Sequence, residues 1–472
     1  MRLARLALVP FVSSVALAAA LTAPATAQTP PPASVPAAPV ALPPGLRPFP
    51  GPRAQPLTAL HNLSNRAGRS HNPTISASGQ TVAVAWEEHS EGAGDIFVAV
   101  SVDGGRTYAA PVNVSRSATP SQLPRVLVTP SHVAVAWTEA TPTGAQIFTA
   151  VHGGPPSSAF PPARLLDRAA VVPDSLTLAG GADAAGIAWM ESASAGSTSI
   201  LKYADLLTGR VSLITVGGPY LAYPTLLRLD LGSGIGPAVV FLKPGAGASP
   251  GSVEVAAPRA PGASWATVSL VPSWPAYGRR GPLLARGEGL SFILGEAVTS
   301  ASAFSQTLTP NFHTVWSSGG RAALALPSLN QSGSLTTLNT DTAGDVVISP
   351  LGPGFVVATS QAGQRGLSYT NPKTRESVAV TGAVNEARIA ANASFHFAVA
   401  RLVDTGNIEH VVAGKFRGDG SSFYELLPAE IAATTNTTNL RVVGTSVGAA
   451  YAWEYGPRGQ EEIAAFADTA SP

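Results

Sequence analysis

A short apolar stretch recurs along this sequence at a period of about 52 residues, which points to a repeat architecture. Eight copies share a run of small and large apolar residues, and they end at Trp86, Trp137, Trp189, Phe241, Leu294, Thr359, Arg401 and Trp453. Each copy follows another short apolar stretch and a turn, as PTISASGQ does before VAVAW. A period near 50 residues with about four short strands per unit is typical of a β-propeller blade. We therefore predict an all-β fold, a β-propeller of eight four-stranded blades, with seven or six blades as the alternatives.

The alternation inside the repeat supports this architecture over a pair of β-sandwiches, which would not keep one register over eight units. In VAVAW, the large residues Val82, Val84 and Trp86 lie on one strand face and the two alanines lie on the other. Inner blade strands are covered on both faces by neighbouring blades, so large residues of one blade can pack on small residues of the next. We interpret the recurring tryptophan as a packing residue.

The two ends of the chain predict how the ring closes. The last unit ends with EEIAAFADTASP, one strand short of a blade. Residues 56–64 (PLTALHNLS) resemble 108–115 (YAAPVNVS), the outermost strand of the first unit, but they have no unit of their own. We predict that this N-terminal strand completes the last blade, which would leave no unpaired strand edge at the seam.

The N-terminal residues predict export. Arg2 and Arg5 precede an apolar run, and Ala25-Thr26-Ala27 fits a cleavage site that would release the chain at Gln28. An uncleaved membrane anchor is the alternative, and no second apolar span long enough to cross a bilayer follows. We predict a signal peptide over 1–27, a Pro/Ala-rich spacer over 28–55 and the propeller over 56–472. The expected location is secreted, periplasmic or at the cell surface.

Composition excludes several classes of function. The formal net charge of the 472-residue chain is +1 and only 12% of its residues are charged, which argues against nucleic acid as a partner. The chain has no cysteine, so disulfides, iron–sulfur clusters and Cys-ligated zinc are excluded. The eight histidines show no metal-binding spacing, and the motifs of zinc peptidases, phosphate-binding loops and nucleophile elbows are missing. We expect a monomer with no metal and no cofactor.

One turn is more specific than the rest of the sequence. Ser101, Asp103, Gly105, Thr107 and Tyr108 follow the order Ser-x-Asp-x-Gly-x-Thr-aromatic. This order resembles the Asp box, or BNR repeat, of sialidases and other secreted propellers, in which Trp or Phe usually takes the position of Tyr108. In such a turn the aspartate accepts backbone amides and the glycines adopt positive φ. We call residues 101–108 the clasp, and degraded copies lie at 260–265 and 418–423.

The resemblance to sialidases implies a catalytic site on the face opposite the clasp. That machinery includes three arginines that bind a carboxylate, a Tyr–Glu nucleophile pair and an aspartic acid. Where the first arginine normally precedes Ile-Pro, this chain has GRSHNPTIS, with Arg69 out of register. The candidates for the catalytic groups are Arg279, Arg280, Tyr277, Asp174 and Glu386.

Acidic residues recur near the end of the second strand of each unit. They are Glu88, Glu139, Glu191, Glu296 and Glu454. One interpretation is that each carboxylate accepts hydrogen bonds within its own loop. The other is a ring of negative potential on the ligand face that attracts cations.

The function that these observations favour is a secreted, non-catalytic binding or interaction module for a glycan or a protein at the cell surface. The alternative is a glycoside hydrolase of the exo-sialidase type. A scaffold tethered through the spacer is a third hypothesis that the residues do not separate from the first.

Overall fold

The structure is a computed structural model of the chain. It describes residues 46–48, 60–65, 68–89, 94–153, 159–169, 173, 176–182, 184–192, 198–217, 221–230, 235–243, 251–258, 263–274, 279–289, 291–302, 305–316, 344–349, 352–361, 364–371, 374–379, 383–403, 409–417, 423–425 and 437–469. Contacts divide the chain into Met1–Ala41 and Leu42–Pro472, and every described residue belongs to the second unit. All regular elements in the described part are β-strands.

The strands fall into eight successive groups, which we number as blades 1 to 8. Blade 1 contains β3 (Ser70–Ser78), β4 (Thr81–Glu88), β5 (Asp95–Ser101) and β6 (Val112–Asn113). Blade 2 contains β7 (Ser121–Val128), β8 (His132–Thr141), β9 (Gly144–Gly153) and β10 (Arg164–Ala169). Blade 3 contains β11 (Leu176–Gly181), β12 (Ala184–Ser192), β13 (Ser199–Asp205) and β14 (Val211–Gly217). Blade 4 contains β15 (Ala222–Asp230), β16 (Ile235–Lys243), β17 (Gly251–Pro258) and β18 (Trp265–Trp274).

The second half of the chain continues the same order. The described strands of blade 5 are β19 (Arg279–Gly289), β20 (Ser291–Ser302) and β21 (Ser305–Trp316). Blade 6 contains β22 (Gly344–Ser349), β23 (Gly352–Gln361), β24 (Gln364–Asn371) and β25 (Thr374–Ala379). Blade 7 contains β26 (Ala383–Ala391), β27 (Phe395–Val403), β28 (Glu409–Arg417) and β29 (Phe423–Glu425). Blade 8 contains β30 (Thr438–Thr445), β31 (Gly448–Tyr455) and β32 (Glu462–Thr469), and β2 (His61–Asn62) pairs with β32 as its fourth strand.

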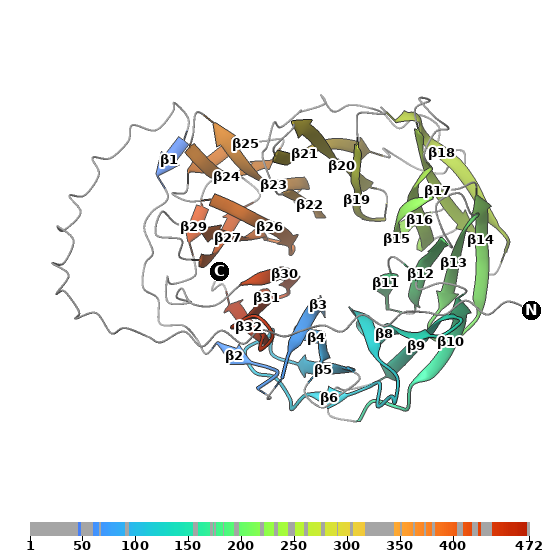
Figure 1. The fold of residues 1–472 in the computed structure, drawn as a ribbon. Helices are drawn as coiled ribbons and strands as arrows, with labels where there is room; N and C mark the ends of the chain where they lie inside the picture. The colour runs from blue at the N-terminus through green and yellow to red at the C-terminus, as the bar shows by residue number, and fades with distance from the viewer. Residues whose placement is uncertain are drawn as a thin grey trace, which may run out of the picture. The chain divides into compact units, whose positions relative to one another are not determined.

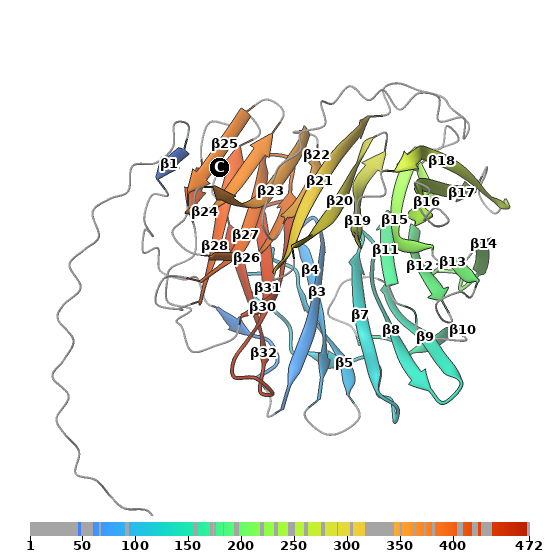
Figure 2. The ribbon, with the colours of Figure 1, turned by 45° about the horizontal axis from the view of Figure 1, so that its top comes forward.

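The first strands of the eight blades contact one another in a closed order, β3–β7–β11–β15–β19–β22–β26–β30 and back to β3 (Figure 1). Within each blade, successive strands are antiparallel neighbours. Figure 2 shows the same strands turned, with the blades following one another in chain order. The prediction of a β-propeller closed by an N-terminal strand is confirmed. Two parallel pairings were not predicted. β1 (Leu46–Pro48), within the Pro/Ala-rich spacer, pairs with β25, and β15 pairs with β19, which joins blades 4 and 5 into one sheet.

Large-against-small packing between blades forms the core. The tryptophans at the ends of the second strands of blades 1, 2, 3 and 8 are fully buried. Ala83 and Ala85 of blade 1 belong to one buried cluster with Val135 and Trp137 of blade 2. On the opposite face of blade 1, Trp86 packs in a cluster with alanines of blade 8. Each alternating strand therefore presents alanines to one neighbour and bulky residues to the other, as the sequence predicts.

The seam between the chain ends is closed by backbone and side-chain bonds. In β2, Asn62 is the partner of Ala464 in β32. The amide of Leu63 donates to the carbonyl of Ile463 at 2.8 Å, and the amide of Ile463 donates to Ser64 Oγ at 3.0 Å. Leu63, only 6% exposed, joins the same cluster as Trp86. These contacts cover the outer edge of β32.

The clasp is held by a closed set of hydrogen bonds. Ser101 Oγ donates to Asp103 Oδ1 at 2.7 Å and accepts the amide of Gly105 at 2.8 Å. Thr107 donates its amide to Asp103 Oδ1 at 2.9 Å and its hydroxyl to Oδ2 at 2.7 Å. Gly104 and Gly105 have φ of +80° and +93°, which favours glycine at both positions. The turn therefore depends on the aspartate as acceptor and on the glycines for its backbone shape.

The clasp also contacts the seam. A Cβ on Gly104 would lie 2.6 Å from Val447 Cγ2, and one on Gly105 would lie 3.2 Å from Ala450, both in blade 8. His61 of β2 lies with Nε2 2.6 Å from the carbonyl oxygen of Arg106, and its ring meets the Tyr108 ring edge-on at 5.7 Å. This turn therefore fixes blade 1 to both partners at the closure.

Removing the closing strand should destabilise the protein. A variant lacking 28–64 should unfold at a lower temperature than the parent or aggregate, because the edge of β32 becomes exposed. A variant lacking 28–45 keeps β1 and β2 and should unfold at the same temperature as the parent. A variant lacking 28–50 removes β1 but keeps β2, so its difference from the 28–45 deletion measures the contribution of β1. Thermal unfolding by circular dichroism compares the three, and equal midpoints for the 28–64 and 28–45 deletions would refute the closure.

The clasp should give a pH-dependent contribution to stability. Burial opposes ionisation of Asp103, but hydrogen bonds from Thr107 and Ser101 outweigh it and lower its pKa to about 2. Since the folded pKa lies below the unfolded value of about 4, the contribution is present above pH 4 and is lost as pH falls towards 2. Asp103→Ala should cost about 1–2 kcal/mol of unfolding free energy at pH 7, because the turn is partly exposed. Urea unfolding at pH 7, 4 and 2.5 should show the difference in unfolding free energy between the parent and Asp103→Ala becoming smaller as the pH falls. A difference that stays constant would contradict the role of the ionised Asp103 as the acceptor in the clasp.

Candidate functional site

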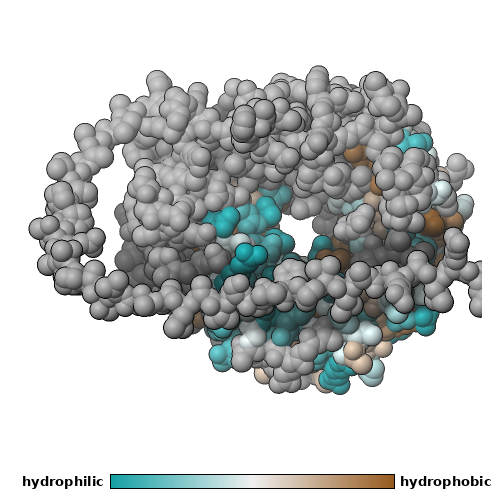
Figure 3. All heavy atoms as spheres, viewed as in Figure 1, coloured by the Kyte–Doolittle hydropathy of each residue, from teal (hydrophilic) through white to brown (hydrophobic). Residues whose placement is uncertain are grey.

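The starts of the first strands and the ends of the second strands lie at one face of the ring, which we call the entry face. Antiparallel pairing places Ser70 opposite Glu88, and Ser121 opposite Glu139. The clasp lies at the other end of the blade, since the amide of Gly104 donates to Gln80 in the β3–β4 turn. Figure 3 shows an opening in the middle of the ring, with hydrophilic residues beside it over β26 and β30.

A bulge opens the first strand of several blades at this face. The residues with positive φ there are Asn72, Leu123 and Asn439, at +53° to +55°. In β3, β7 and β30 the register with the second strand shifts across these residues. Each bulge turns one backbone amide away from the hydrogen bonds between the first and second strands. That amide can then bond to a group outside its own blade.

Two glutamates accept these amides and link neighbouring blades. Glu454 Oε1, at the end of β31, accepts the amide of Asn72 in blade 1 at 2.5 Å. Glu87 Oε1, at the end of β4, accepts the amide of Leu123 in blade 2 at 2.8 Å. Both glutamates directly follow a buried tryptophan. We call these two contacts the glutamate latches, and they flank blade 1 on both sides.

The other recurring acids bond within their own blades. Glu88, Glu139 and Glu191 are 3–5% exposed, and each accepts the indole N–H of the tryptophan two residues before it at 3.1–3.4 Å. Glu88 also accepts Ser70 Oγ, and Lys202 forms an ion pair with Glu191 at 2.8 Å.

The fourth and fifth acids of the predicted series differ from these three. Glu454 has the register of Glu87, one residue after its tryptophan, and accepts Thr438 Oγ1 and Asn439 Nδ2 besides the latch. Among the described residues, Trp453 Nε1 accordingly has no hydrogen-bond partner. The side chain of Glu296, on β20, lies outside the described residues.

Three arginines gather at the entry face from different blades, and we call them the arginine cluster. They are Arg125 in β7, Arg388 in β26 and Arg441 in β30. Each donates Nη1 to the carbonyl of the residue before it at 2.8–2.9 Å. Glu386 Oε1 lies 2.9 Å from Arg388 Nη2 and 3.9 Å from Arg441 Nη1. Arg125 forms no ion pair within the described residues.

The positive charges of this cluster are not fully compensated. Burial and then the charge of Arg388 lower the pKa of Arg441 to about 10, while Glu386 opposes the shift and Arg125 adds to it. Burial also lowers the pKa of Arg125, against the attraction of Glu87. The side chains of Arg388 and Arg441 are about a third exposed. The cluster can therefore receive an anion from solvent.

The catalytic candidates from the sequence have different placements. Glu386 lies in the arginine cluster. Arg279 and Arg280 begin β19, but their side chains are outside the described part of the chain, as are Tyr277 and Asp174 altogether. The sequence did not indicate Arg125, Arg388 or Arg441. The signal that could have found them is an arginine between the fourth and the sixth residue of the first strand, as in LPR, EAR and NLR.

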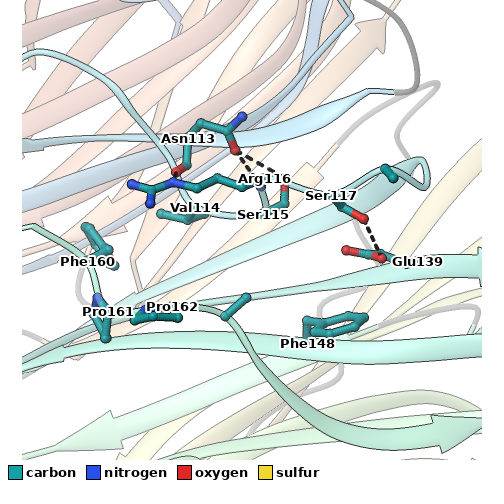
Figure 4. Close-up of a pocket in the computed structure, with 12 residues that line it drawn as sticks. Asn113, Val114, Ser115, Arg116, Ser117, Glu139, Phe148, Phe160, Pro161 and Pro162 are labelled. Atoms are coloured by element: carbon teal, nitrogen blue, oxygen red, sulfur yellow. Dashed lines mark hydrogen bonds between the residues drawn. The ribbon is translucent and has the colours of Figure 1, made fainter.

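A cavity of about 470 Å³ lies between blades 1 and 2, lined by Asn113–Ala118, Glu139, Phe148 and Phe160–Ala163. In Figure 4, Phe148, Phe160 and two prolines lie opposite the loop that carries Arg116. Its polar side chains are already paired, since Ser117 Oγ donates to Glu139 at 2.8 Å and Arg116 Nε donates to the Asn113 carbonyl at 3.1 Å. The cavity therefore offers apolar surface with one cation at its edge and suits binding rather than chemistry.

Comparisons with known proteins show that the fold of this chain is similar to that of other β-propellers. Protein-family models and curated proteins give no match to the sequence. Among solved structures, the chain is similar to the β-propeller domain of the trilobed protease from Pyrococcus furiosus, with a TM-score of 0.42, 10% identity, and coverage of 75% of this chain and 95% of that one. It is also similar to the Hadza microbial sialidase Hz136 (TM-score 0.35, 11% identity, 85% and 65% covered). A third match is Trypanosoma rangeli sialidase in complex with the inhibitor DANA (TM-score 0.35, 12% identity, 87% and 59% covered).

A membrane-spanning helix is not part of the described structure: none of the segments searched has both the length and the hydropathy for one.

Loss of the latch between blades 8 and 1 should destabilise the ring. Glu454→Ala leaves the Asn72 amide and the Thr438 and Asn439 side chains without an acceptor, so we expect a loss of about 2–4 kcal/mol in unfolding free energy. Glu454→Gln keeps one acceptor oxygen and should recover part of it. Arg458→Ala, in the exposed β31–β32 turn, is the control. If Glu454→Ala unfolds at the same urea concentration as Arg458→Ala, the latch does not stabilise the ring.

Proposed function

We propose that this chain is an exported propeller of the Asp-box, sialidase-like type that acts as a non-catalytic binding module. Its ligand is an anionic group, carried by an acidic glycan or an acidic protein segment at the cell surface. The binding site is the arginine cluster at the entry face. The observation that carries the proposal is that the guanidinium groups of Arg388 and Arg441 share the single carboxylate of Glu386, while Arg125 adds a third positive charge that acts on Arg441.

The physical argument is electrostatic. Burying a guanidinium group and bringing like charges together both cost free energy. Burial and then the charge of Arg388 lower the pKa of Arg441, and burial lowers the pKa of Arg125. An anion between the guanidinium groups would relieve this cost. A planar guanidinium fork also matches the two oxygens of a carboxylate or sulfate, which adds geometric selectivity. The latch acid Glu454 attracts Arg441 but forms no ion pair with it within the described residues, and its oxygens accept three other hydrogen bonds.

The clasp supports the Asp-box part of the proposal. Its hydrogen bonds are those expected of such a turn, and it lies away from the entry face, where it can hold the blade without contacting a ligand. Export rests on the predicted signal peptide, and the Pro/Ala-rich segment would then separate the propeller from the cleavage site.

The alternative, an exo-sialidase, needs the same carboxylate clamp and in addition a nucleophile and an acid. Within the described residues, no hydrogen bond or ion pair joins a tyrosine to the arginine cluster. Glu386 forms an ion pair with Arg388 at 2.9 Å, so its carboxylate is already engaged in holding the arginine. We therefore favour binding over hydrolysis.

The test measures binding and turnover in parallel. We expect the purified protein to bind sialylated, uronate or sulfated glycans, or a polyglutamate peptide, in preference to matched neutral probes, and to bind more weakly as salt rises. The Arg388→Ala/Arg441→Ala double variant should lose on the order of tenfold to a hundredfold in affinity. The control Arg210→Ala, in an exposed turn, should bind like the parent.

Two outcomes would overturn this choice. A preference for neutral probes, or unchanged binding by a folded double variant, would remove the arginine cluster as the site. Turnover of a fluorogenic sialoside by the parent, abolished by the double variant or by Arg279→Ala/Arg280→Ala, would establish the hydrolase instead.

A further inference from the structure

His71, Glu87 and His89 converge at the entry face of blade 1. His71 lies in β3 opposite Glu87 of β4, and His89 follows the end of β4. One side-chain ligand atom from each residue lies within 4.8 Å of the other two. Glu87 Oε2 is 3.0 Å from His71 Nε2 and 3.7 Å from His89 Nε2. The two imidazole rings face one another, with centroids 4.7 Å apart.

The two carboxylate oxygens of Glu87 have different partners, and only one of them faces the imidazole rings. Oε1 accepts Asn72 Nδ2 and the Leu123 amide, each at 2.8 Å. Oε2 points at both histidines. Burial opposes ionisation of Glu87, but hydrogen bonds from His71 and Asn72 outweigh it and lower its pKa, so it is a carboxylate at neutral pH. Only 4% of its side chain is exposed.

The histidine atoms are incompletely used. Among the described residues, His89 Nε2 is buried and has no hydrogen-bond partner, although it faces a carboxylate oxygen 3.7 Å away. A buried polar atom without a partner costs free energy, which a bound ion would offset. About a third of the His89 side chain is exposed, which leaves a path from solvent.

The position of His89 is fixed by its surroundings. Its amide donates to the Arg69 carbonyl at 2.8 Å. Gly94 has φ of +86°, and a Cβ there would lie 2.6 Å from His89 Cε1, so a larger residue would displace the ring. The three groups therefore come from two paired segments of blade 1, β3 and the end of β4, and Gly94 limits the position of the His89 ring.

We propose that His71, Glu87 and His89 form a binding site for a divalent transition-metal ion of the zinc type, through two imidazole nitrogens and one carboxylate oxygen. In a tetrahedral zinc site with bonds near 2.0–2.1 Å, neighbouring ligand atoms are about 3.3 Å apart, and the two distances to Glu87 Oε2 bracket this value. Calcium and magnesium are excluded as preferred ions, because they take oxygen ligands and only one oxygen is offered.

The nearby charges modulate this site without removing it. Arg125 is attracted to Glu87 and would weaken cation binding. Burial opposes ionisation of Glu461, but hydrogen bonds from the backbone amides of Gly459 and Glu461, with smaller effects of Arg69 and His71, lower its pKa, and it is paired with Arg69 at 3.1 Å. Three protein ligands leave a fourth position for water or for a donor atom of a ligand.

Zinc titration of the chelator-treated protein, followed by calorimetry, tests the site directly. We expect one saturable zinc ion per chain, and Co²⁺ in its place should give the visible absorption of a low-coordinate site. His89→Ala should weaken binding at least about tenfold. His132→Ala, at the half-buried first residue of β8, is the matched control and should bind zinc like the parent.

A second measurement separates metal binding from misfolding. Zinc should raise the unfolding temperature of the parent and of His132→Ala but not of His89→Ala. In the absence of metal, His89→Ala should unfold like the parent, because Nε2 has no hydrogen bond to lose. The proposal is overturned if the parent binds no zinc in stoichiometric amount, or if His71→Ala and His89→Ala both bind and respond as the parent does.

Discussion

The pairing of β2 with β32 joins segments about 400 residues apart, and it removes the strand edge that blade 8 would otherwise expose. Two hydrogen bonds, from the Leu63 amide to the Ile463 carbonyl and from the Ile463 amide to Ser64 Oγ, extend this junction, and the apolar side chain of Leu63 enters the core beneath it. Each blade packs one face on the preceding blade and the other face on the following blade. Only a closed ring therefore gives every blade, including blades 1 and 8, a partner on both faces. The clasp and the latch from Glu454 act at opposite ends of the same junction between blades 1 and 8, so blade 1 carries contacts that hold the ends of the chain together.

The position of the clasp gives a physical reason for its retention in blade 1. An internal blade is held on both sides by neighbours that precede and follow it in the chain, so sheet packing suffices. Blade 1 instead meets blade 8, whose first three strands lie at the other end of the chain and whose fourth strand, β2, comes directly before β3. There the turn at Asp103 presents Gly104 and Gly105 to Val447 and Ala450, where side chains larger than glycine would collide.

The repeat and its alternation predict the propeller, the order of its strands and the closing strand, because those depend on local periodicity and on a count of strands. The site depends on features that a periodic pattern does not express. The bulges at Asn72 and Leu123 alter the register by local backbone conformation, and no rule based on alternation places a residue in positive φ there. The sequence pattern places Glu454 and Glu88 in one series of acids. Glu454 follows its tryptophan by one residue and bonds to the next blade, whereas Glu88 follows its tryptophan by two residues and bonds within its own blade. His71 and Glu87 are 16 residues apart and become partners only through antiparallel pairing.

Glu87 connects the two charged sites of the entry face. Its Oε1 latches blade 2, its Oε2 faces the histidines, and its negative charge favours the protonated form of Arg125. A cation bound at His71 and His89 would offset that charge and leave Arg125 with less compensation. An anion would then bind to the arginine cluster with a more favourable free energy. Because linkage is reciprocal, an anion at the arginines must strengthen cation binding by the same factor. The two proposed sites are therefore expected to bind cooperatively, through a carboxylate that also holds two blades together.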